Sequence, residues 1–302
     1  MYRSGLTAML NRRQLLSRLG CTIALCATSS ALAGPQQAAV PLRTTRGGRL
    51  MLDIEVNGAS VEALLDSGAE MTLLNRAFAE QLDLVATSTE TARGSGKGVL
   101  EAGIVEGVTL EAAGLVLEDQ TVAVIDLTDV ATRLLGHPLH AILGRELFDA
   151  ARLQIDIEGG TLAVVSSSAE PRGTGLPLTS EHGIETFPVR VEGGPPVQAA
   201  LDLGNGSNVL IGAAYARRAG LLDGRPATRE RGGGLGGETE REVIRLKSLE
   251  VAGRTFHDVP ASIDDQSSAT DVNVGVSILR HFVITTDFDA RSVWLEPRVT
   301  KS

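Results

Sequence analysis

Cysteine is confined to one end of this 302-residue chain, and aromatic residues make up only 3% of it. Cys21 and Cys26 both lie within the first 33 residues, so residues 34–302 contain no thiol. Disulfides, thiolate catalysis and thiolate metal sites are therefore excluded from that part of the chain. Because Phe, Trp and Tyr are scarce, the core must be built mostly from Val, Leu, Ile and Ala.

The apolar stretch near the start of the chain, residues 19–33, is too short to cross a bilayer comfortably. It follows Arg12, Arg13 and Arg18 and ends in Ala-Leu-Ala, which predicts a cleaved export signal over residues 1–33. The arginine pair resembles a twin-arginine signal, and an ordinary Sec signal with a chance arginine pair fits equally well. We expect an exported protein, periplasmic or secreted, that is not attached to a membrane after cleavage.

Positive charge is also in short supply, with 28 Lys and Arg against 37 Asp and Glu. The first 33 residues hold four arginines and no acid, so removing them leaves 24 minus 37, a net charge of −13. Such a chain is not expected to bind nucleic acid or anionic lipid. Its 43% hydrophobic and 22% charged residues are typical of a soluble globular protein.

Motifs for metals, cofactors and serine nucleophiles are weak. His137 and His140 flank a proline and are better interpreted as loop histidines than as a metal pair. The other three histidines are scattered, and none is accompanied by a Gly-x-Ser-x-Gly elbow. Residues 232–237 fit Gly-x-Gly-x-x-Gly, but they do not open a helix in a βαβ unit. We expect no metal and no cofactor.

The most informative stretch is an apolar strand that runs into an Asp-Ser-Gly turn. Two alternating runs, residues 49–56 and 60–65, flank an Asn-Gly dipeptide and predict a hairpin that delivers Asp66. A carboxylate at the end of a buried strand needs hydrogen bonds. Ser67 offers a hydroxyl, and Gly68 lets the backbone bring amides close. Taken alone, this is also an ordinary turn in which the aspartate caps its own loop.

The second half of the chain repeats this pattern. A hairpin over residues 187–201 delivers Asp202, and glycine-rich loops and apolar-Gly motifs follow in the same order in both halves. Asp66 precedes Gly144 by 78 residues, and Asp202 precedes Gly275 by 73. The repeat predicts an all-β protein of two duplicated units with short helices, each unit contributing one aspartate. We place the segments as a lead-in at 34–48, an N-terminal lobe at 49–165, a linker at 166–178 and a C-terminal lobe at 179–299.

The run from Asp66 to Ala69, with a distal Ile142-Leu143-Gly144, resembles the pepsin-like and retropepsin-like aspartic peptidases. The resemblance covers roughly residues 48–297. It implies two retropepsin-like β-barrel lobes in a pepsin-like bilobal architecture. It also implies that Asp66 and Asp202 face each other within one polypeptide, so that a monomer suffices. The active-site loops would be supported by Ser67, Gly68, Ala69, Leu203, Gly204 and Asn205.

The glycine loop at residues 93–98 is placed like the flap that closes over substrate in that family, with Gly94, Ser95 and Gly96 as candidates. The loop at residues 231–237 is its counterpart in the repeat. No tyrosine lies near the first loop, so a pepsin-type flap tyrosine is absent.

The second aspartate is followed by Leu203, where the family has Thr or Ser. In relatives that hydroxyl bonds to the opposite lobe, so Ser67 is expected to lose its reciprocal partner. We hypothesise that the Asn205 side chain contacts the outer carboxylate oxygen of Asp202.

The resemblance implies an aspartic endopeptidase acting on a peptide or protein substrate. Asp66 and Asp202 would share a proton and activate a water between them, and neither residue is assigned a separate role. Because Leu203 departs from the family pattern, the alternative is a catalytically impaired pepsin-like protein. Such a protein would bind an extended peptide in the cleft between the lobes.

Overall fold

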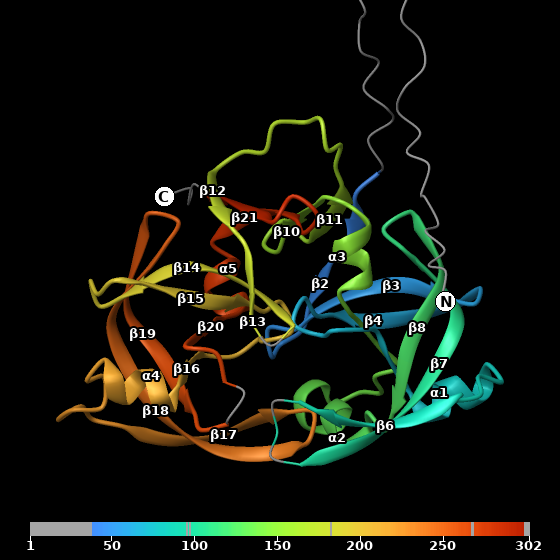
Figure 1. The fold of residues 1–302 in the computed structure, drawn as a ribbon, viewed down its shortest axis with the longest axis horizontal. Coiled ribbons are helices and arrows are strands. Elements are labelled where there is room, and N and C mark those ends of the chain that lie inside the picture. Colours follow the sequence, from blue (N-terminus) through green and yellow to red (C-terminus); the bar gives the residue numbers. More distant parts are fainter. Residues whose placement is uncertain (1–37, 95, 97, 182, 267–268, 299–302) are drawn as a thin grey trace, which may run out of the picture. The chain divides into compact units, whose positions relative to one another are not determined.

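The computed structural model describes residues 38–94, 96, 98–181, 183–266 and 269–298. The predicted export signal and the flap candidate Ser95 lie outside these residues, and export stays a prediction. Strands dominate and the helices are short (Figure 1), so the predicted all-β fold is confirmed. Within the described ranges, no helix combines the length and apolar character needed to cross a membrane.

The first lobe is an eight-stranded sheet in the order β2-β3-β4-β9-β5-β8-β7-β6. The predicted hairpin joins β3 to β4 through Asn57 and Gly58, which both have positive φ as a type I′ turn requires. An additional pairing of β3 with β7 curls the sheet on itself. Its strands are β2 (Arg43–Thr44), β3 (Leu50–Val56), β4 (Ala59–Leu65), β5 (Leu73–Asn75), β6 (Ser88–Arg93), β7 (Val99–Ala112), β8 (Leu115–Ile125) and β9 (Ala141–Leu143).

Short helices connect these strands. The first of them ends at Gln81, shortly before Asp83, whose left-handed conformation does not continue a helix. The helices of this half are α1 (Arg76–Gln81), α2 (Thr128–Val130), the π-helix η1 (Ala131–Leu135) and α3 (Glu146–Ala150).

The second lobe repeats the first strand for strand, in the order β13-β14-β15-β20-β16-β19-β18-β17. The parallel pair of β4 with β9 has its counterpart in β15 with β20, and β14 pairs with β18 as β3 does with β7. The predicted duplication is therefore confirmed. Its elements are β13 (Thr179–Glu181), β14 (Ile184–Val191), β15 (Pro196–Leu201), β16 (Val209–Gly212), α4 (Ala213–Arg218), β17 (Thr228–Gly234), β18 (Gly237–Val251), β19 (Arg254–Asp264), β20 (Val272–Val274) and α5 (Val276–Leu279).

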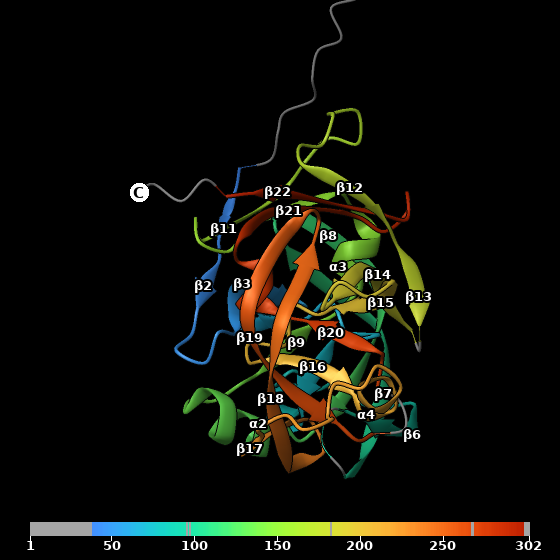
Figure 2. The same ribbon diagram turned by 90° about the vertical axis from the view of Figure 1, so that its left-hand side faces the viewer.

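A third sheet of six strands takes members from both halves, in the order β1-β11-β10-β21-β22-β12 (Figures 1 and 2). Strand β10 of the first half pairs antiparallel with β21 of the second, so one hydrogen-bonded ladder joins the lobes. Residues 174–177, within the stretch predicted as a linker, form its edge strand β12. The strands are β1 (Val40–Pro41), β10 (Leu153–Asp156), β11 (Thr161–Val164), β12 (Thr174–Pro177), β21 (Phe282–Asp287) and β22 (Ser292–Pro297).

The core beneath these sheets is mostly aliphatic, as the composition requires, and its main cluster runs from one lobe into the other. Phe148 and Phe288, one from each half, stack with ring centroids 5.2 Å apart. A smaller apolar cluster belongs to the first lobe and includes Met51, Leu127 and Ile142. The two lobes are thus joined by continuous packing as well as by the shared ladder.

The glycines that end β9 and β20 let these strands pass directly beneath the aspartate loops. A Cβ added to Gly144 would lie 2.5 Å from the carbonyl carbon of Met71. A Cβ added to Gly275 would lie 2.2 Å from the backbone carbonyl oxygen of Asn205. Such distances are far below ordinary van der Waals contact. Glycine is therefore required at both positions for steric reasons.

Replacing Gly144 by alanine should lower the free energy of unfolding by about 1–3 kcal/mol, because the added methyl group meets backbone atoms that cannot move aside. Denaturant unfolding checks this. Gly232→Ala is the matched control, since its added Cβ would have its nearest neighbour at 3.6 Å. Equal losses in the two variants would contradict the steric explanation.

Candidate active site

Asp66 and Asp202 occupy corresponding places, each directly after the second strand of its hairpin. The backbone N–H of Asp66 donates to Leu143 O at 3.0 Å, and that of Asp202 donates to Val274 O at 3.1 Å. Each aspartate is thus anchored to the apolar-Gly strand of its own lobe. The same main-chain hydrogen bond in each half therefore fixes the backbone position of both aspartates.

The two carboxylates face one common space. A Cβ on Gly68 would lie 3.2 Å from Asp66 Oδ1 and 3.4 Å from Asp202 Oδ1, so both oxygens border the same glycine. On the other side, a Cβ on Gly204 would overlap the Asp66 carboxylate. The glycine of each loop makes room for the carboxylates, and the structure brings together the two aspartates that the sequence singled out.

The loop amides supply hydrogen bonds to both carboxylates. The Gly68 N–H donates to Asp66 Oδ1 at 2.8 Å, and the Asn205 N–H donates to Asp202 Oδ1 at 2.9 Å. These bonds offset part of the cost of placing charge in a half-buried position.

One buried hydroxyl links the two active-site loops. Ser67 Oγ donates to Leu201 O at 2.6 Å and accepts from the Leu203 N–H at 3.0 Å. The expectation that Ser67 loses its partner across the lobes is therefore wrong, because both of its bonds are made with backbone atoms, which leucine retains. The fully buried Leu203 side chain has no hydroxyl to return the contact and packs in the main core. The inter-lobe link is one-sided.

The hypothesis that the Asn205 side chain contacts Asp202 is also wrong, because both the oxygen and the nitrogen of its amide form hydrogen bonds with other residues. Asn205 Oδ1 accepts from the N–H and hydroxyl of Ser207, each at 3.0 Å. Its Nδ2 donates to Asn208 O at 3.1 Å and to Asn273 Oδ1 at 2.8 Å. Only its backbone N–H reaches the carboxylate.

The side chain that does reach Asp202 is that of Asn273, whose Nδ2 donates to Asp202 Oδ2 at 2.7 Å. Asn273 is the middle residue of β20, and sequence reasoning missed it. The available signal was a polar residue within an apolar-Gly motif, where the first half of the chain has Ile142.

Both carboxylates are harder to ionise than an ordinary aspartate. Burial and, next, the negative charge of Asp202 raise the pKa of Asp66 to about 7. Burial also raises the pKa of Asp202, while hydrogen bonds from Asn273 and from the N–H groups of Asn205 and Gly204 act in the opposite direction. The two groups titrate as a pair that retains one proton over much of the acidic range.

A buried cation lies near this pair. Arg49 is 9% exposed, its Nη1 donates to Gly47 O at 2.7 Å, and its charge favours the ionised forms of both Asp202 and Asp66. Burial lowers the pKa of Arg49 itself. The turn that carries it packs on the second active-site loop, since a Cβ on Gly48 would lie 2.5 Å from Gly206 O.

The two glycine loops meet tip to tip. The Gly96 N–H donates to Leu235 O and the Gly98 N–H donates to Gly236 O, both at 2.7 Å. Gly94 also lies at this contact, because a Cβ there would be 2.3 Å from the Leu235 Cβ. The flap candidates Gly94 and Gly96 therefore lie against the matching loop of the second lobe, which makes that loop a second flap candidate.

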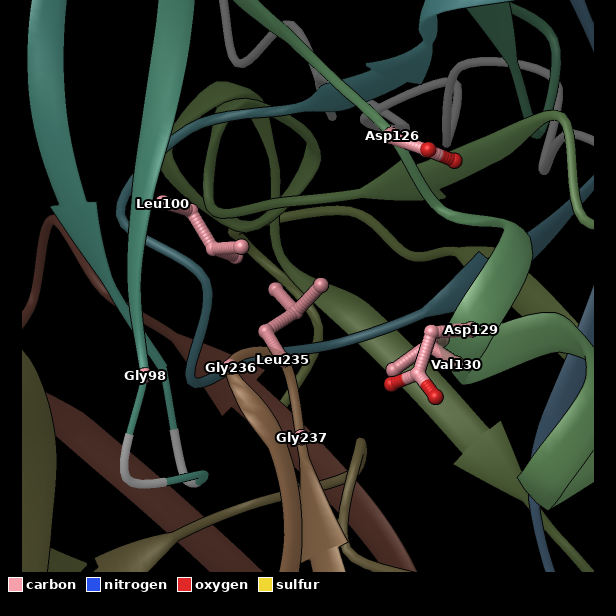
Figure 3. A pocket seen from close by; sticks show the side chains of 8 residues that line it. All are labelled: Gly98, Leu100, Asp126, Asp129, Val130, Leu235, Gly236 and Gly237. Atoms are coloured by element: carbon pink, nitrogen blue, oxygen red, sulfur yellow. The ribbon is translucent and has the colours of Figure 1, made fainter.

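A small pocket of about 100 Å³ lies beside the paired tips. Figure 3 shows Leu235 between Leu100 and the helical segment that carries Asp129 and Val130. On that segment, Arg133 forms an ion pair with Asp129 and donates from Nη2 to Gly234 O at 2.8 Å. In addition to the two backbone hydrogen bonds, one apolar side chain and one arginine thus hold the tip of the second flap on the first lobe.

Among the described residues, no group of three or more His, Cys, Asp or Glu side chains is placed to hold a metal ion. His137 lies in an exposed loop, whereas the His140 ring packs at 5.5 Å from that of Phe78.

Comparison with known proteins assigns the class. The sequence model of the aspartyl protease family matches the chain twice, over residues 52–147 and 187–278. The two matches together span more than half of the chain, and each contains one of the aspartates. The chain therefore belongs to this family of retropepsin-like aspartic peptidases.

Among individual relatives, the chain is similar to Protein DDI1 homolog 2 from Danio rerio, with 26% identity over 133 residues. The match covers 41% of this chain and 28% of that protein, so the chain spans less than a third of the relative's length.

Removing the Ser67 hydroxyl should loosen the link between the lobes. Ser67→Ala leaves the Leu203 N–H and the Leu201 carbonyl without this partner, and we expect a loss of about 1–3 kcal/mol in the free energy of unfolding. Ser67→Thr keeps the hydroxyl and serves as the control in denaturant titrations. An alanine variant as stable as the threonine variant would show that the bridge contributes little.

Weakening the contact between the flap tips should expose their amides. In Leu235→Ala the second tip loses its apolar anchor, and we expect at least about tenfold faster hydrogen exchange at the Gly96 and Gly98 amides, equivalent to about 1.4 kcal/mol. NMR-detected exchange measures this without requiring activity. Val116→Ala, at an exposed position, is the control. Unchanged exchange in Leu235→Ala would mean that this leucine does not hold the tips together.

Proposed function

We propose that this chain is an aspartic endopeptidase that hydrolyses peptide bonds with a water activated between Asp66 and Asp202. The observation that carries the proposal is the pair of aspartates on duplicated loops. Both face one space, both have a raised pKa, and a family match covers each of them.

The chemistry follows from the shared proton. Two carboxylates this close cannot both remain charged in a half-buried site, so one stays protonated while the other is ionised. The ionised carboxylate accepts a proton from the water as it attacks, and the protonated carboxyl donates to the substrate carbonyl oxygen. The carbon–nitrogen bond then breaks: the amine takes the proton that the base accepted from water, the acid regains its proton from the tetrahedral intermediate, and no covalent enzyme intermediate forms.

The flaps suit an extended substrate. Glycine-rich tips expose main-chain N–H and C=O groups, which can pair with a peptide backbone regardless of its side chains. In the structure these groups bond to each other across the lobes, so the flaps must separate before a chain can enter. Because both aspartates belong to one polypeptide, we infer that a single chain suffices for activity.

Leu203 supports a second candidate, a protein that binds an extended peptide in the same cleft and cleaves it slowly or not at all. The missing hydroxyl removes half of the inter-lobe link. We favour the peptidase because the Ser67 hydroxyl still bonds to the second loop and both carboxylates still accept hydrogen bonds from loop amides.

The test is cleavage of an unfolded protein substrate from pH 3 to pH 8 by wild type, Asp66→Asn and Asp202→Asn. We expect each variant to lose about 100-fold or more of the activity, the scale of general acid–base catalysis. Wild-type activity should fall as the pH rises through about 7, because Asp66 loses its proton there and the pair becomes doubly charged.

Outcomes separate the two candidates. Cleavage that survives in both variants, or none by wild type at any pH, would defeat the peptidase. Saturable binding of a peptide by an inactive wild type would support the second candidate.

A further inference from the structure

The second lobe carries an amide where the first carries a hydrocarbon. Asn273 pairs with Ala200 on one side and Leu210 on the other, in the register that Ile142 has with Leu64 and Leu73. Ile142 is buried in the apolar cluster of the first lobe. The same position of the duplicated strands therefore holds an amide that bonds to Asp202 in one lobe and a buried hydrocarbon in the other.

The hydrogen bonds fix which way the Asn273 amide points. Asn205 Oδ1 accepts from the Ser207 backbone N–H, which can only donate, so Asn205 Nδ2 must face Asn273. Asn273 must then accept with Oδ1 and present its NH2 group to Asp202. This chain of hydrogen bonds starts at the Ser207 backbone N–H, and it excludes the flipped orientation of the Asn273 amide.

This orientation distinguishes the two carboxylates. Both oxygens of Asp202 accept from N–H donors, Oδ1 from the Asn205 backbone and Oδ2 from Asn273. A protonated oxygen would need an acceptor, and an NH2 group cannot accept, so the contact favours the charged form. The carboxylate of Asp66 is stabilised by the backbone N–H groups of Gly68 and Ala69, and its lobe has Ile142 where the other has the side-chain donor Asn273.

We propose that Asn273 is a positioning residue that holds Asp202 as the ionised member of the pair and leaves the shared proton on Asp66. Asp202 is then the base that takes the proton from water, and Asp66 is the acid that protonates the carbonyl oxygen. The roles within the reaction rest on the proposed function, whereas the charge assignment does not. The charged groups acting on Asp202 are Asp66 and Arg49, and both remain in the variants that change Asn273 alone.

The decisive variant is Asn273→Ile, which gives the second lobe the residue of the first. Without the donated N–H, the carboxylate of Asp202 is less stable, so its pKa rises. The acidic limb of the kcat/KM profile should move to higher pH by about one unit, a tenfold change in the ionisation constant. Thr270→Val is the matched control, because it removes a buried hydrogen bond to Val272 O beside the same strand without touching a carboxylate. A purely structural role for Asn273 would lower activity in both variants and move the limb in neither.

A second measurement does not need cleavage. With ¹³Cγ-labelled aspartate, NMR titration of Asp66→Asn reads Asp202 without its partner, and adding Asn273→Ile should raise the pKa of Asp202 by about one unit. If wild type proves inactive but this shift appears, the proposed function fails and the charge assignment stands. If wild type cleaves and neither the limb nor the NMR titration moves, the inference about Asn273 is overturned. An acidic limb that moves to lower pH would overturn it as well.

Discussion

The repulsion between two carboxylates in one half-buried space is the constraint on which the rest of this structure depends. Neither aspartate could be placed there without donors, so each loop turns at once and offers its N–H groups. Neither could be held near the other without rigid support, so an apolar strand passes beneath each loop and ends in a glycine that admits close contact. Burial raises the pKa of both carboxylates, and the charge of Asp202 adds to the rise at Asp66. What the fold provides is two copies of one support, brought face to face.

Much of this could be predicted from the sequence, because repetition is visible in one dimension. The alternating hairpins, the Asp66 and Asp202 loops and the apolar-Gly strands recur at similar spacing, and the family matches fall on the two copies. Contacts between the copies could not be predicted in the same way. The joining of β10 to β21 and the pairing of the flap tips each bring a segment of one copy against a segment of the other, and repetition along the chain does not show which segments meet.

The directions in which side chains point also could not be predicted from the sequence. Asn205 lies next to the carboxylate in sequence, so a side-chain contact was the natural hypothesis, yet a bond to Ser207 turns its amide away. Asn273 is 71 residues from Asp202 and reaches it because β20 pairs with β15. For Leu203, the residue type correctly indicated a missing hydroxyl, but it did not show that Ser67 could retain both of its bonds with backbone atoms.

The shared six-stranded sheet has an evolutionary consequence. A site built from two identical subunits must accept every substitution twice, at symmetry-related positions, so a change that helps one aspartate is imposed on the other. Here both halves belong to one polypeptide and are joined through β10 and β21. Each half is therefore free to diverge. Ser67 opposite Leu203, and Ile142 opposite Asn273, are asymmetries that a homodimer could not encode, and they allow two aspartates of common origin to hold different charges.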